Sequence, residues 1–242
     1  MLVTRWVRWC LVLCFAWVSP VYAQTLVCGL ATGFPPYQFQ EQDRPAGFDV
    51  EVIRLIAKRT GLDIQLRQDK WDDVINFLRF GKIDCVIGME INPLRTRYFD
   101  FTVDYYKRHD VVFVRADNPN VNRVEDLFSR VISGDRHSFV ETYWRGLGII
   151  QKMRVMQPES KEKAMQLLFD GRTEAAIMPR GVGVYLAKKL NLKVRILDSP
   201  DPGSPVAIAV KKGNVALQAM LNHGLQSLIK DGEIDRLYRQ WF

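Results

Sequence analysis

The feature that most constrains the fold is the segment 71–87, whose pattern recurs later in the chain. It predicts an amphipathic helix that ends at Gly81, followed by a short apolar strand buried on both faces. The segment 161–178 has the same order and is offset by 90 residues, so that Gly171 corresponds to Gly81. An offset this long is no solenoid period, and it predicts two similarly built α/β lobes. The apolar residues of the first helix are Trp71, Val74, Ile75 and Leu78.

Residues 88–95 follow the first of these buried strands and are predicted to form a polar turn that carries Arg95. A loop just past the carboxyl end of a parallel strand is where open α/β sheets bind ligands. The guanidinium of Arg95 is planar and permanently charged, which suits it to a carboxylate. Because the chain has 34 Lys and Arg residues, a solvated surface arginine is the alternative interpretation. The equivalent loop of the second lobe is Pro179-Arg180.

The first 23 residues are predicted to be a cleaved signal peptide. Arg5 and Arg8 precede an apolar run at 10–18, and small residues precede the expected cleavage point before Gln24. The apolar run is too short to favour a membrane span. We therefore expect export and release as a soluble periplasmic protein.

Charge and cysteine content argue against several classes of protein. The formal net charge of +7 is spread along the chain, whereas a nucleic-acid interface needs a concentrated basic patch, so we expect no nucleic-acid partner. Cys28 and Cys85 each lie in an apolar run, and we expect two buried thiols, although an exported protein can also form a disulfide. No His/Cys cluster has zinc spacing, and we expect neither a metal nor a cofactor.

Two crossings between the lobes are predicted near 107–110 and 203–206, and polar breaks interrupt the chain at 117–122 and 199–205. Lobe one would then comprise 24–108 and 206–242, and lobe two would comprise 109–205. Two strand-like crossings form a hinge that can close the lobes on a ligand.

Three segments carry a resemblance to a known family. They are GFDVEV at 47–52, NPLR at 92–95 followed by YFDFT, and the ending LQSLIKDGEIDRLYRQWF. Together they resemble the family 3 extracellular solute-binding proteins, which are periplasmic amino-acid-binding proteins, over essentially the whole chain from Thr25. The resemblance implies the type II periplasmic-binding-protein fold, in which two α/β lobes of mixed, mostly parallel sheets are flanked by helices and joined by two crossover strands as a hinge. It also implies a monomeric, non-enzymatic protein that closes on a small carboxylate-bearing ligand, an amino acid or a related compound, and serves an ABC permease.

The same resemblance implies roles for individual residues. Phe34 matches the family's stacking aromatic residue, and Trp71 matches the aromatic residue that covers the other face of the ligand. Arg95 matches the clamp for the ligand's α-carboxylate, and Ser138 or Phe139 matches an amide donor from the second lobe. The complete set of expected ligand-binding residues is Phe34, Tyr37, Trp71, Gly88, Met89, Glu90, Asn92, Arg95, Ser138, Phe139 and Arg180.

Some positions depart from the family pattern. Glu90 and Asn92 stand where the family has hydroxyl residues that hold the amino and carboxylate groups. The family's amine-binding aspartate falls at Pro179, with Arg180 beside it, and a cation cannot receive an ammonium group. Either Glu90 supplies the lost negative charge for an amino-acid-like ligand, or Arg95 and Arg180 bind a ligand with two anionic groups.

Two rival functions fit the same fold. A binding module that serves a sensor kinase or a periplasmic dehydrogenase needs only the same closing cleft. Cyclohexadienyl dehydratases also resemble these binding proteins, but they place a general-acid carboxylate near the position of Pro179 and Arg180, where this chain has none.

Overall fold

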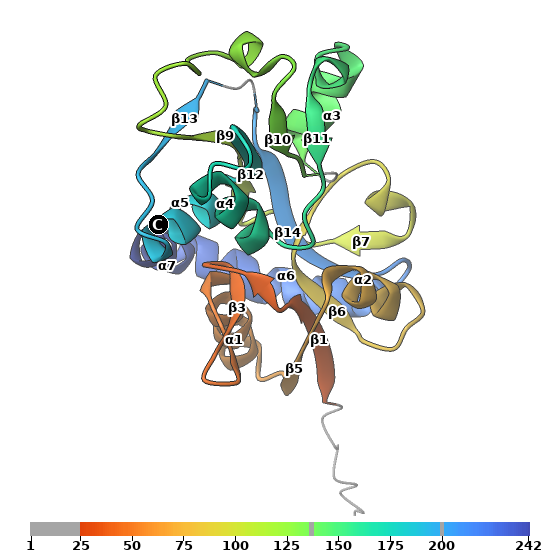
Figure 1. Cartoon of the computed structure of the whole chain (residues 1–242). Coiled ribbons are helices and arrows are strands. Elements are labelled where there is room, and N and C mark those ends of the chain that lie inside the picture. Colours follow the sequence, from red (N-terminus) through yellow and green to blue (C-terminus); the bar gives the residue numbers. More distant parts are fainter. Residues whose placement is uncertain (1–24, 136–137, 199–200) are drawn as a thin grey trace, which may run out of the picture.

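The computed structural model of the chain describes residues 25–135, 138–198 and 201–242. The predicted signal peptide at 1–23 lies outside these ranges. Two main β-sheets, each flanked by helices, build the molecule (Figure 1). Within the described ranges no helix combines the length and the apolar character that crossing a membrane would need.

The first sheet has parallel strands at its centre and an antiparallel strand that returns late in the chain. In spatial order its strands are β5 (Ile64–Asp69), β1 (Leu26–Ala31), β6 (Cys85–Glu90), β14 (Ser204–Lys211) and β7 (Phe99–Phe101), with β8 (Tyr106–Arg108) also paired to β14. Strands β1, β5 and β6 are mutually parallel, and β14 runs antiparallel to its neighbours.

Helices cover both faces of the first sheet. Helices α1 (Phe48–Thr60) and α6 (Val215–Lys230) pack on one face, and α2 (Trp71–Arg79) packs on the other. Cys85 and Ile87 face α1, whereas Val86 faces α2, as the two-residue period of a strand requires. Cys28 is the parallel partner of Cys85 on β1, and both are free, buried thiols.

The second sheet has the same construction. Its strand order is β11 (Arg154–Met156), β10 (Val131–Ser133), β12 (Ala175–Pro179), β9 (Asp110–Arg115) and β13 (Val194–Leu197). Helices α4 (Lys161–Phe169) and α5 (Arg180–Lys189) pack on one face and α3 (Phe139–Gly146) on the other. Phe113 of β9 faces α4 and α5, while its neighbours Val112 and Val114 pack with Trp144 of α3.

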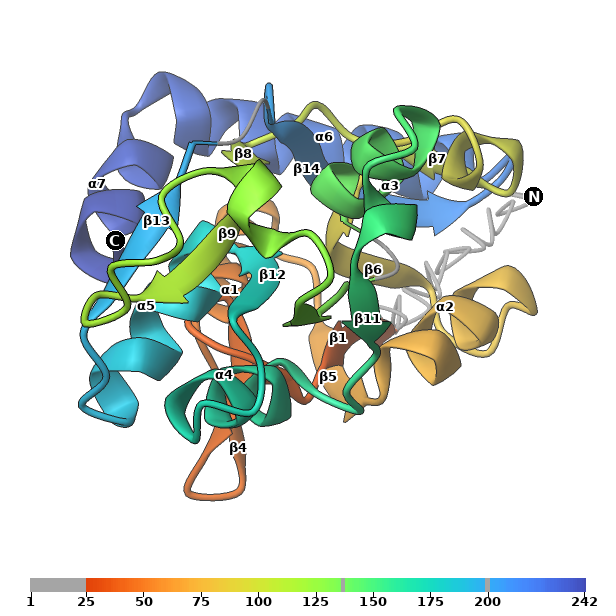
Figure 2. The same cartoon turned by 45° about the horizontal axis from the view of Figure 1, so that its top comes forward.

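Short elements complete the described chain. A small three-stranded sheet is formed by β2 (Gly33–Phe34), β3 (Gln38–Glu41) and β4 (Arg44–Ala46). The 3₁₀ helices are η1 (Arg95–Arg97), η2 (Val124–Leu127) and η3 (Ile150–Lys152), and the final helix is α7 (Glu233–Trp241). Figures 1 and 2 place the end of α7 beside the start of α5, where Phe242 lies so close to Gly181 that a Cβ there would come within 2.7 Å of its ring.

The chain passes between the two sheets at two adjacent places. It leaves the first sheet after Arg108 and enters the second at Asp110, and it returns after Leu197 to begin β14 at Ser204, before the expected boundary at 206. Ser204 is the strand partner of Arg108, so the two crossings lie side by side. The Asp201 carboxylate accepts hydrogen bonds from the backbone amides of Asp110 and Gly203 and thereby ties the crossings together.

Strand β6 extends through Gly88, Met89 and Glu90, so the prediction of a turn starting at residue 88 is wrong. Ala207 of β14 lies opposite Met89 and Ala209 lies opposite Val86, which gives β6 one extra residue over this interval. This is a β-bulge, and Gly88 adopts a φ of 73° within it. The bulge turns the Met89 side chain toward α2, into the cluster that contains Val74, instead of toward α1.

The expected loop at Pro179-Arg180 is also wrong. Pro179 is the last residue of β12, and Arg180 is already the first residue of α5. The sequence RGVGV at 180–184 gives little local helix signal because glycine disfavours a helix interior. Close packing accounts for one of these glycines, since a Cβ at Gly183 would lie 2.0 Å from the Phe113 ring.

Candidate functional site

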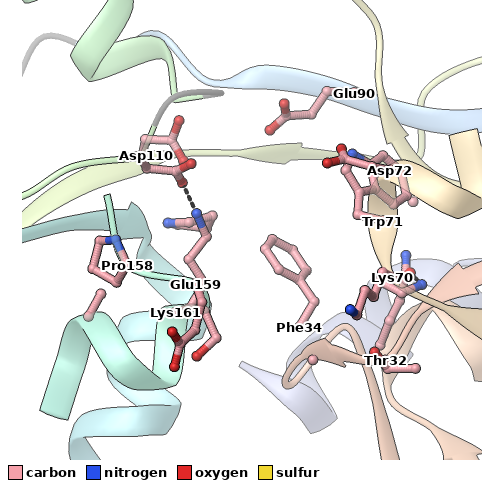
Figure 3. Close-up of a pocket in the computed structure, with 18 of the residues that line it drawn as sticks. Thr32, Phe34, Lys70, Trp71, Asp72, Glu90, Asp110, Pro158, Glu159 and Lys161 are labelled. Carbon is pink, nitrogen blue, oxygen red and sulfur yellow. Dashed lines mark hydrogen bonds and ion pairs between the residues drawn. The ribbon is translucent and has the colours of Figure 1, made fainter. Parts of the chain in front are cut away.

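A cavity of about 470 Å³ lies between the two sheets and is lined by residues from both (Figure 3). The first sheet contributes its strand ends and the start of α2, and the second contributes its strand ends and the start of α4. From the first side the lining residues are Ala31, Thr32, Gly33, Phe34, Gln38, Lys70, Trp71, Asp72, Gly88, Glu90, Arg95 and Arg108. From the second side they are Asp110, Gly134, Asp135, Gln157, Pro158, Glu159, Ser160, Lys161, Ala164 and Pro179.

Glu90 lies between two arginines on the first side of the cavity. Its Oε2 is 3.7 Å from Nη1 of Arg95, and its Oε1 is 3.4 Å from Nη1 of Arg108. Arg95 also donates from Nη1 to the Glu90 carbonyl at 2.9 Å. Burial lowers the pKa of Arg95, with the charge of Glu90 opposing this shift and that of Arg108 adding to it. The three side chains carry a net charge of about +1, which leaves room for one anionic group of a ligand.

Arg108 is the central residue of the site that the sequence reasoning missed. Its Nη2 donates to the Gly88 carbonyl at 3.1 Å and to the Tyr106 hydroxyl at 2.6 Å. Its guanidinium lies 4.7 Å from the Phe34 ring centre. Burial alone would lower the pKa of Arg108, but Tyr106, Glu90 and other neighbours outweigh it and keep the pKa raised. The one available signal was its position directly before the first crossing.

Two aromatic rings line the same part of the cavity. The Arg95 guanidinium lies 5.5 Å from the centre of the Trp71 ring, and the Arg108 guanidinium lies 4.7 Å from the centre of the Phe34 ring. Figure 3 shows the Phe34 ring pointing into the cavity, with Glu90 across from it. Each ring therefore stacks on an arginine while its remaining surface stays available to a ligand.

A buried polar network holds these strand ends together. The Gln38 side chain accepts from the Ala31 amide at 2.6 Å and donates to Asp49 at 2.7 Å and to the Ile87 carbonyl at 2.9 Å. Asp49 also accepts from the Tyr105 hydroxyl at 2.6 Å. Burial raises the pKa of Asp49, and the charge of Arg108 and these hydrogen bonds oppose the shift. The network fixes β1 and β6 at the point where both reach the cavity.

The second side of the cavity is acidic near α3 and α4. Asp135 forms an ion pair with Lys161. Asp110 is only 4% exposed, and its Oδ2 accepts from the Phe139 amide at 2.8 Å. Burial raises the pKa of Asp110 to about 7, with the charges of Glu90, Asp135 and Asp201 adding to the shift and the Phe139 amide opposing it.

The raised pKa of Asp110 makes stability depend on pH. Because the folded state holds the proton more tightly than the unfolded chain, this contribution to stability is complete below pH 3.8 and is lost as the pH rises through about 7. We expect the wild type to lose about 1–4 kcal/mol of unfolding free energy relative to Asp110→Asn between pH 4 and pH 7.5. Urea unfolding at several pH values measures this difference. A constant difference would contradict the assignment, and Asp117→Asn, at a side chain 78% exposed, is the control.

The structure brings five of the expected ligand-binding residues to the cavity wall: Phe34, Trp71, Gly88, Glu90 and Arg95. The other six lie behind or beside it. Tyr37 is buried behind Phe34, with the ring centres 5.6 Å apart. The Met89 side chain is in the core, so only its backbone can face a ligand. Asn92 accepts from the Arg95 amide at 2.9 Å and fixes the start of η1.

The residues of the second lobe that were expected to contact the ligand do not line the cavity either. Ser138 caps α3 by accepting from the Glu141 amide at 3.0 Å, and the Phe139 amide binds the Asp110 carboxylate. The start of α3 thus binds a carboxylate of the chain itself. Arg180 is exposed, and its charge acts on Tyr238 of α7, so the pair of Arg95 and Arg180 is not brought together in the cavity.

Comparison with known families shows to which family the chain belongs. The model of the bacterial extracellular solute-binding proteins, family 3, matches residues 26–242. The chain belongs to this family. The amino-acid-binding protein AabA of Dichelobacter nodosus is 28% identical over 222 residues, which cover 86% of this chain and 83% of that protein. The L-cystine-binding protein TcyJ of Escherichia coli (strain K12) is 27% identical over 221 residues, covering 90% and 82%.

Solved structures confirm the two-lobed type II periplasmic-binding-protein fold that the sequence predicted. An ancestral arginine-binding protein bound to arginine superposes with a TM-score of 0.80 at 30% identity, covering 90% of this chain and 98% of that chain. A histidine kinase sensor domain with similarity to periplasmic binding proteins gives 0.81 at 26% identity, with coverages of 90% and 96%. The ancestral amino-acid-binding protein AncCDT-1, described as a precursor of cyclohexadienyl dehydratase, gives 0.79 at 28% identity, with coverages of 90% and 95%.

Proposed function

We propose that this solute-binding protein is a periplasmic receptor that closes its two lobes on a small carboxylate-bearing ligand, an amino acid or a related compound, for uptake through an ABC permease. The observation that carries the proposal is the position of Arg95 in a cavity between the two sheets, beside Trp71 and Glu90. The amino-acid-binding names of AabA and TcyJ support the ligand class.

The cavity offers complementary groups for a zwitterion. Arg95 is suited to the α-carboxylate because its guanidinium makes paired, charge-assisted hydrogen bonds. Glu90 lies next to Arg95, and Asp110 lines the cavity from the other lobe, where the charge of Glu90 acts on it. The cavity therefore offers a carboxyl group from each lobe to the ammonium group. Asp110 is the strand partner of Pro179. Its carboxyl group therefore lies beside the position where the family's amine-binding aspartate would stand and this chain has proline. A ligand held by both lobes stabilises the closed state.

Binding is tested first by identifying the ligand. Native mass spectrometry of the purified protein reports what it carries from the cell. After that ligand is removed, amino acids, dicarboxylates and small peptides are added in turn, and thermal unfolding is recorded. A true ligand is expected to stabilise the fold by about 2.7 kcal/mol at a hundredfold excess over its Kd. Unchanged stability across all three classes would refute the proposed function.

Glu90→Gln tests whether Glu90 is the counter-ion of an ammonium group. We expect it to weaken binding of an amino acid by about ten- to a hundredfold, because a charge-assisted hydrogen bond is worth about 1.5–3 kcal/mol. The matching 2-hydroxy acid, which lacks the ammonium group, should lose much less. Calorimetric titration of both ligands measures this difference.

The Glu90 prediction has a control and a contrary result. Asp72→Asn removes another carboxylate of the cavity wall, at an exposed position at the start of α2, and should change affinity little. A ligand with two anionic groups would give the reverse pattern, because Glu90→Gln would then remove a like charge and tighten binding.

A sensory role is a second candidate because the histidine kinase sensor domain superposes with a TM-score of 0.81. In that case a signalling partner, instead of a permease, would recognise the closed form. Deleting the gene and measuring ligand uptake separates the two roles, since a purely sensory module would leave transport intact when the permease is expressed independently.

An enzymatic role has one observation in its favour. Asp110 has a pKa of about 7 and lies on the strand beside Pro179, near the place where cyclohexadienyl dehydratases carry their general acid. Incubation with a 4-hydroxycyclohexadienyl carboxylate tests this role, because a dehydratase would release water and carbon dioxide and form an aromatic product with a distinct absorbance. If the protein binds amino acids but shows no turnover, the enzymatic role is refuted and only the receptor role remains.

A further inference from the structure

The end of α2 that lies away from the cavity carries cations stacked on aromatic rings. The Arg67 guanidinium lies 4.0 Å from the centre of the Phe77 ring, and Nζ of Lys82 lies 5.8 Å from the same ring centre. The Arg79 guanidinium lies 4.1 Å from the centre of the Tyr98 ring. Such stacking holds the long cationic side chains on one face of the protein. We define the α2-end patch as six exposed residues: Arg67, Arg79, Phe80, Lys82, Tyr98 and Lys211.

The fold gathers the four cations of the α2-end patch from separate segments of the chain. Arg67 belongs to β5, Lys211 is the last residue of β14, and the other two lie at the end of α2 and in the turn after it. A Cβ at Gly81 of this turn would lie 3.4 Å from Nζ of Lys211. Of the four cations, only Arg67 has an acidic partner among the described residues, with Asp69 at 3.7 Å. The patch therefore carries an unbalanced positive charge, which is dispersed in the sequence and concentrated by the fold.

An aromatic side chain without cover lies among these cations. Phe80 is 68% exposed, and the Arg79 guanidinium lies 6.0 Å from the centre of its ring. The helix dipole accounts for a cation in the last turn of α2, but it gives no reason for a phenylalanine in water. A membrane surface suits both features, because an apolar side chain enters the headgroup region while the cations meet anionic lipid. A polar, acidic protein surface would satisfy the cations and leave Phe80 in water.

We infer that the α2-end patch docks this protein on an anionic phospholipid surface, with Phe80 entering the headgroup region. This inference rests on the proposed function in one respect, since a receptor that serves a permease works beside a membrane. None of the six patch residues, all within the described chain, lines the cavity. Helix α2 begins at the cavity with Trp71 and is about 13 Å long, so docking by its other end leaves the cavity open to a ligand.

Co-sedimentation with lipid vesicles tests the docking surface. The wild type is expected to bind vesicles of phosphatidylcholine mixed with phosphatidylglycerol, to bind pure phosphatidylcholine vesicles much less, and to lose binding as salt is added. The triple variant Arg79→Gln, Lys82→Gln, Lys211→Gln should lower partitioning into the mixed vesicles about a hundredfold, because each cation near an anionic surface contributes about a factor of five. Phe80→Ser keeps every charge and should lower partitioning about tenfold through the lost apolar contact.

A second triple variant with the same net charge is the matched control. Lys58→Gln, Lys188→Gln, Lys230→Gln removes three exposed lysines from the last turns of α1, α5 and α6. Helices α1 and α6 pack against α7, and Figures 1 and 2 show α7 on the side of the molecule opposite α2. This control should bind the mixed vesicles nearly as well as the wild type. Thermal unfolding checks that both triple variants are folded.

Each other outcome overturns the inference. Equal losses in the two triple variants would mean that the net charge of the protein, and no particular face, attracts the vesicles. Unchanged partitioning of Phe80→Ser would exclude its insertion and favour an acidic protein as the partner of the patch. Absence of binding to the mixed vesicles by the wild type would exclude the membrane surface altogether. Titration of the same samples with amino acids tests the proposed function separately, because the patch lies outside the cavity.

Discussion

Replacing Arg95 with alanine is expected to lower ligand affinity by at least about thirtyfold and to leave the fold intact. Losing one partner of a largely desolvated charge pair costs about 2–5 kcal/mol, and 1.4 kcal/mol is a factor of ten in Kd. Only 14% of the Arg95 side chain is exposed, so its contact with a carboxylate is weakly screened. The change also frees one oxygen of Glu90, whose charge then repels the ligand's carboxylate. Calorimetric titration with the confirmed ligand measures the loss.

Controls separate a lost contact from a disturbed fold. Arg97→Ala removes a neighbouring exposed arginine of the same 3₁₀ helix and should retain affinity. Arg95→Lys keeps the charge without the fork and should fall between the wild type and the alanine variant. Unaltered affinity in Arg95→Ala, with a wild-type circular dichroism spectrum, would disprove the clamp.

Gly88→Ala is expected to reduce the free energy of unfolding by about 2–5 kcal/mol. Gly88 has a φ of 73°, which an L-residue adopts at a cost of about 1–2 kcal/mol. In addition, an ideal Cβ there would lie 2.1 Å from Nε2 of Gln38 and 2.2 Å from Oδ2 of Asp49. Making room would break the hydrogen bond between these two buried side chains, and overpacking of this kind costs about 1–3 kcal/mol. Denaturant unfolding measures the change.

The matched control for Gly88 is Gly33→Ala, which adds the same methyl group to the cavity wall. A Cβ at Gly33 meets nothing within 4 Å, and its φ is not in the left-handed region. We expect its stability to stay within about 0.5 kcal/mol of the wild type, as for surface changes generally. Equal stabilities for Gly88→Ala and the wild type would mean that the bulge of β6 is not needed to hold β1 and β6 in place.

The sequence by itself determined the elements and the family. Helical and strand periodicity, with glycine at the helix ends, located α2 and α4 and the buried strands that follow them, β6 and β12. These signals work because side-chain burial follows a period of 3.6 or 2 within one element, whatever the rest of the chain does. The motif around Arg95 and the segment GFDVEV were enough to assign the family, which the match over residues 26–242 confirms.

Only the tertiary structure decided which groups meet in the cavity. The bulge at Gly88 depends on pairing with Ala207 and Ala209, far along the chain, so local sequence predicted a turn where β6 continues. Apart from its position before the first crossing, Arg108 gave no local signal, because its partners lie on β6 and β2, distant in sequence, and on the tyrosine two residues before it. Arg180 was predicted to lie on a strand-end loop that faces the ligand, but α5 begins at that residue, and Arg180 is not among the residues that line the cavity. For the bulge and for Arg108 the deciding contacts join residues distant in sequence, and short-range periodicity carries no information about such contacts.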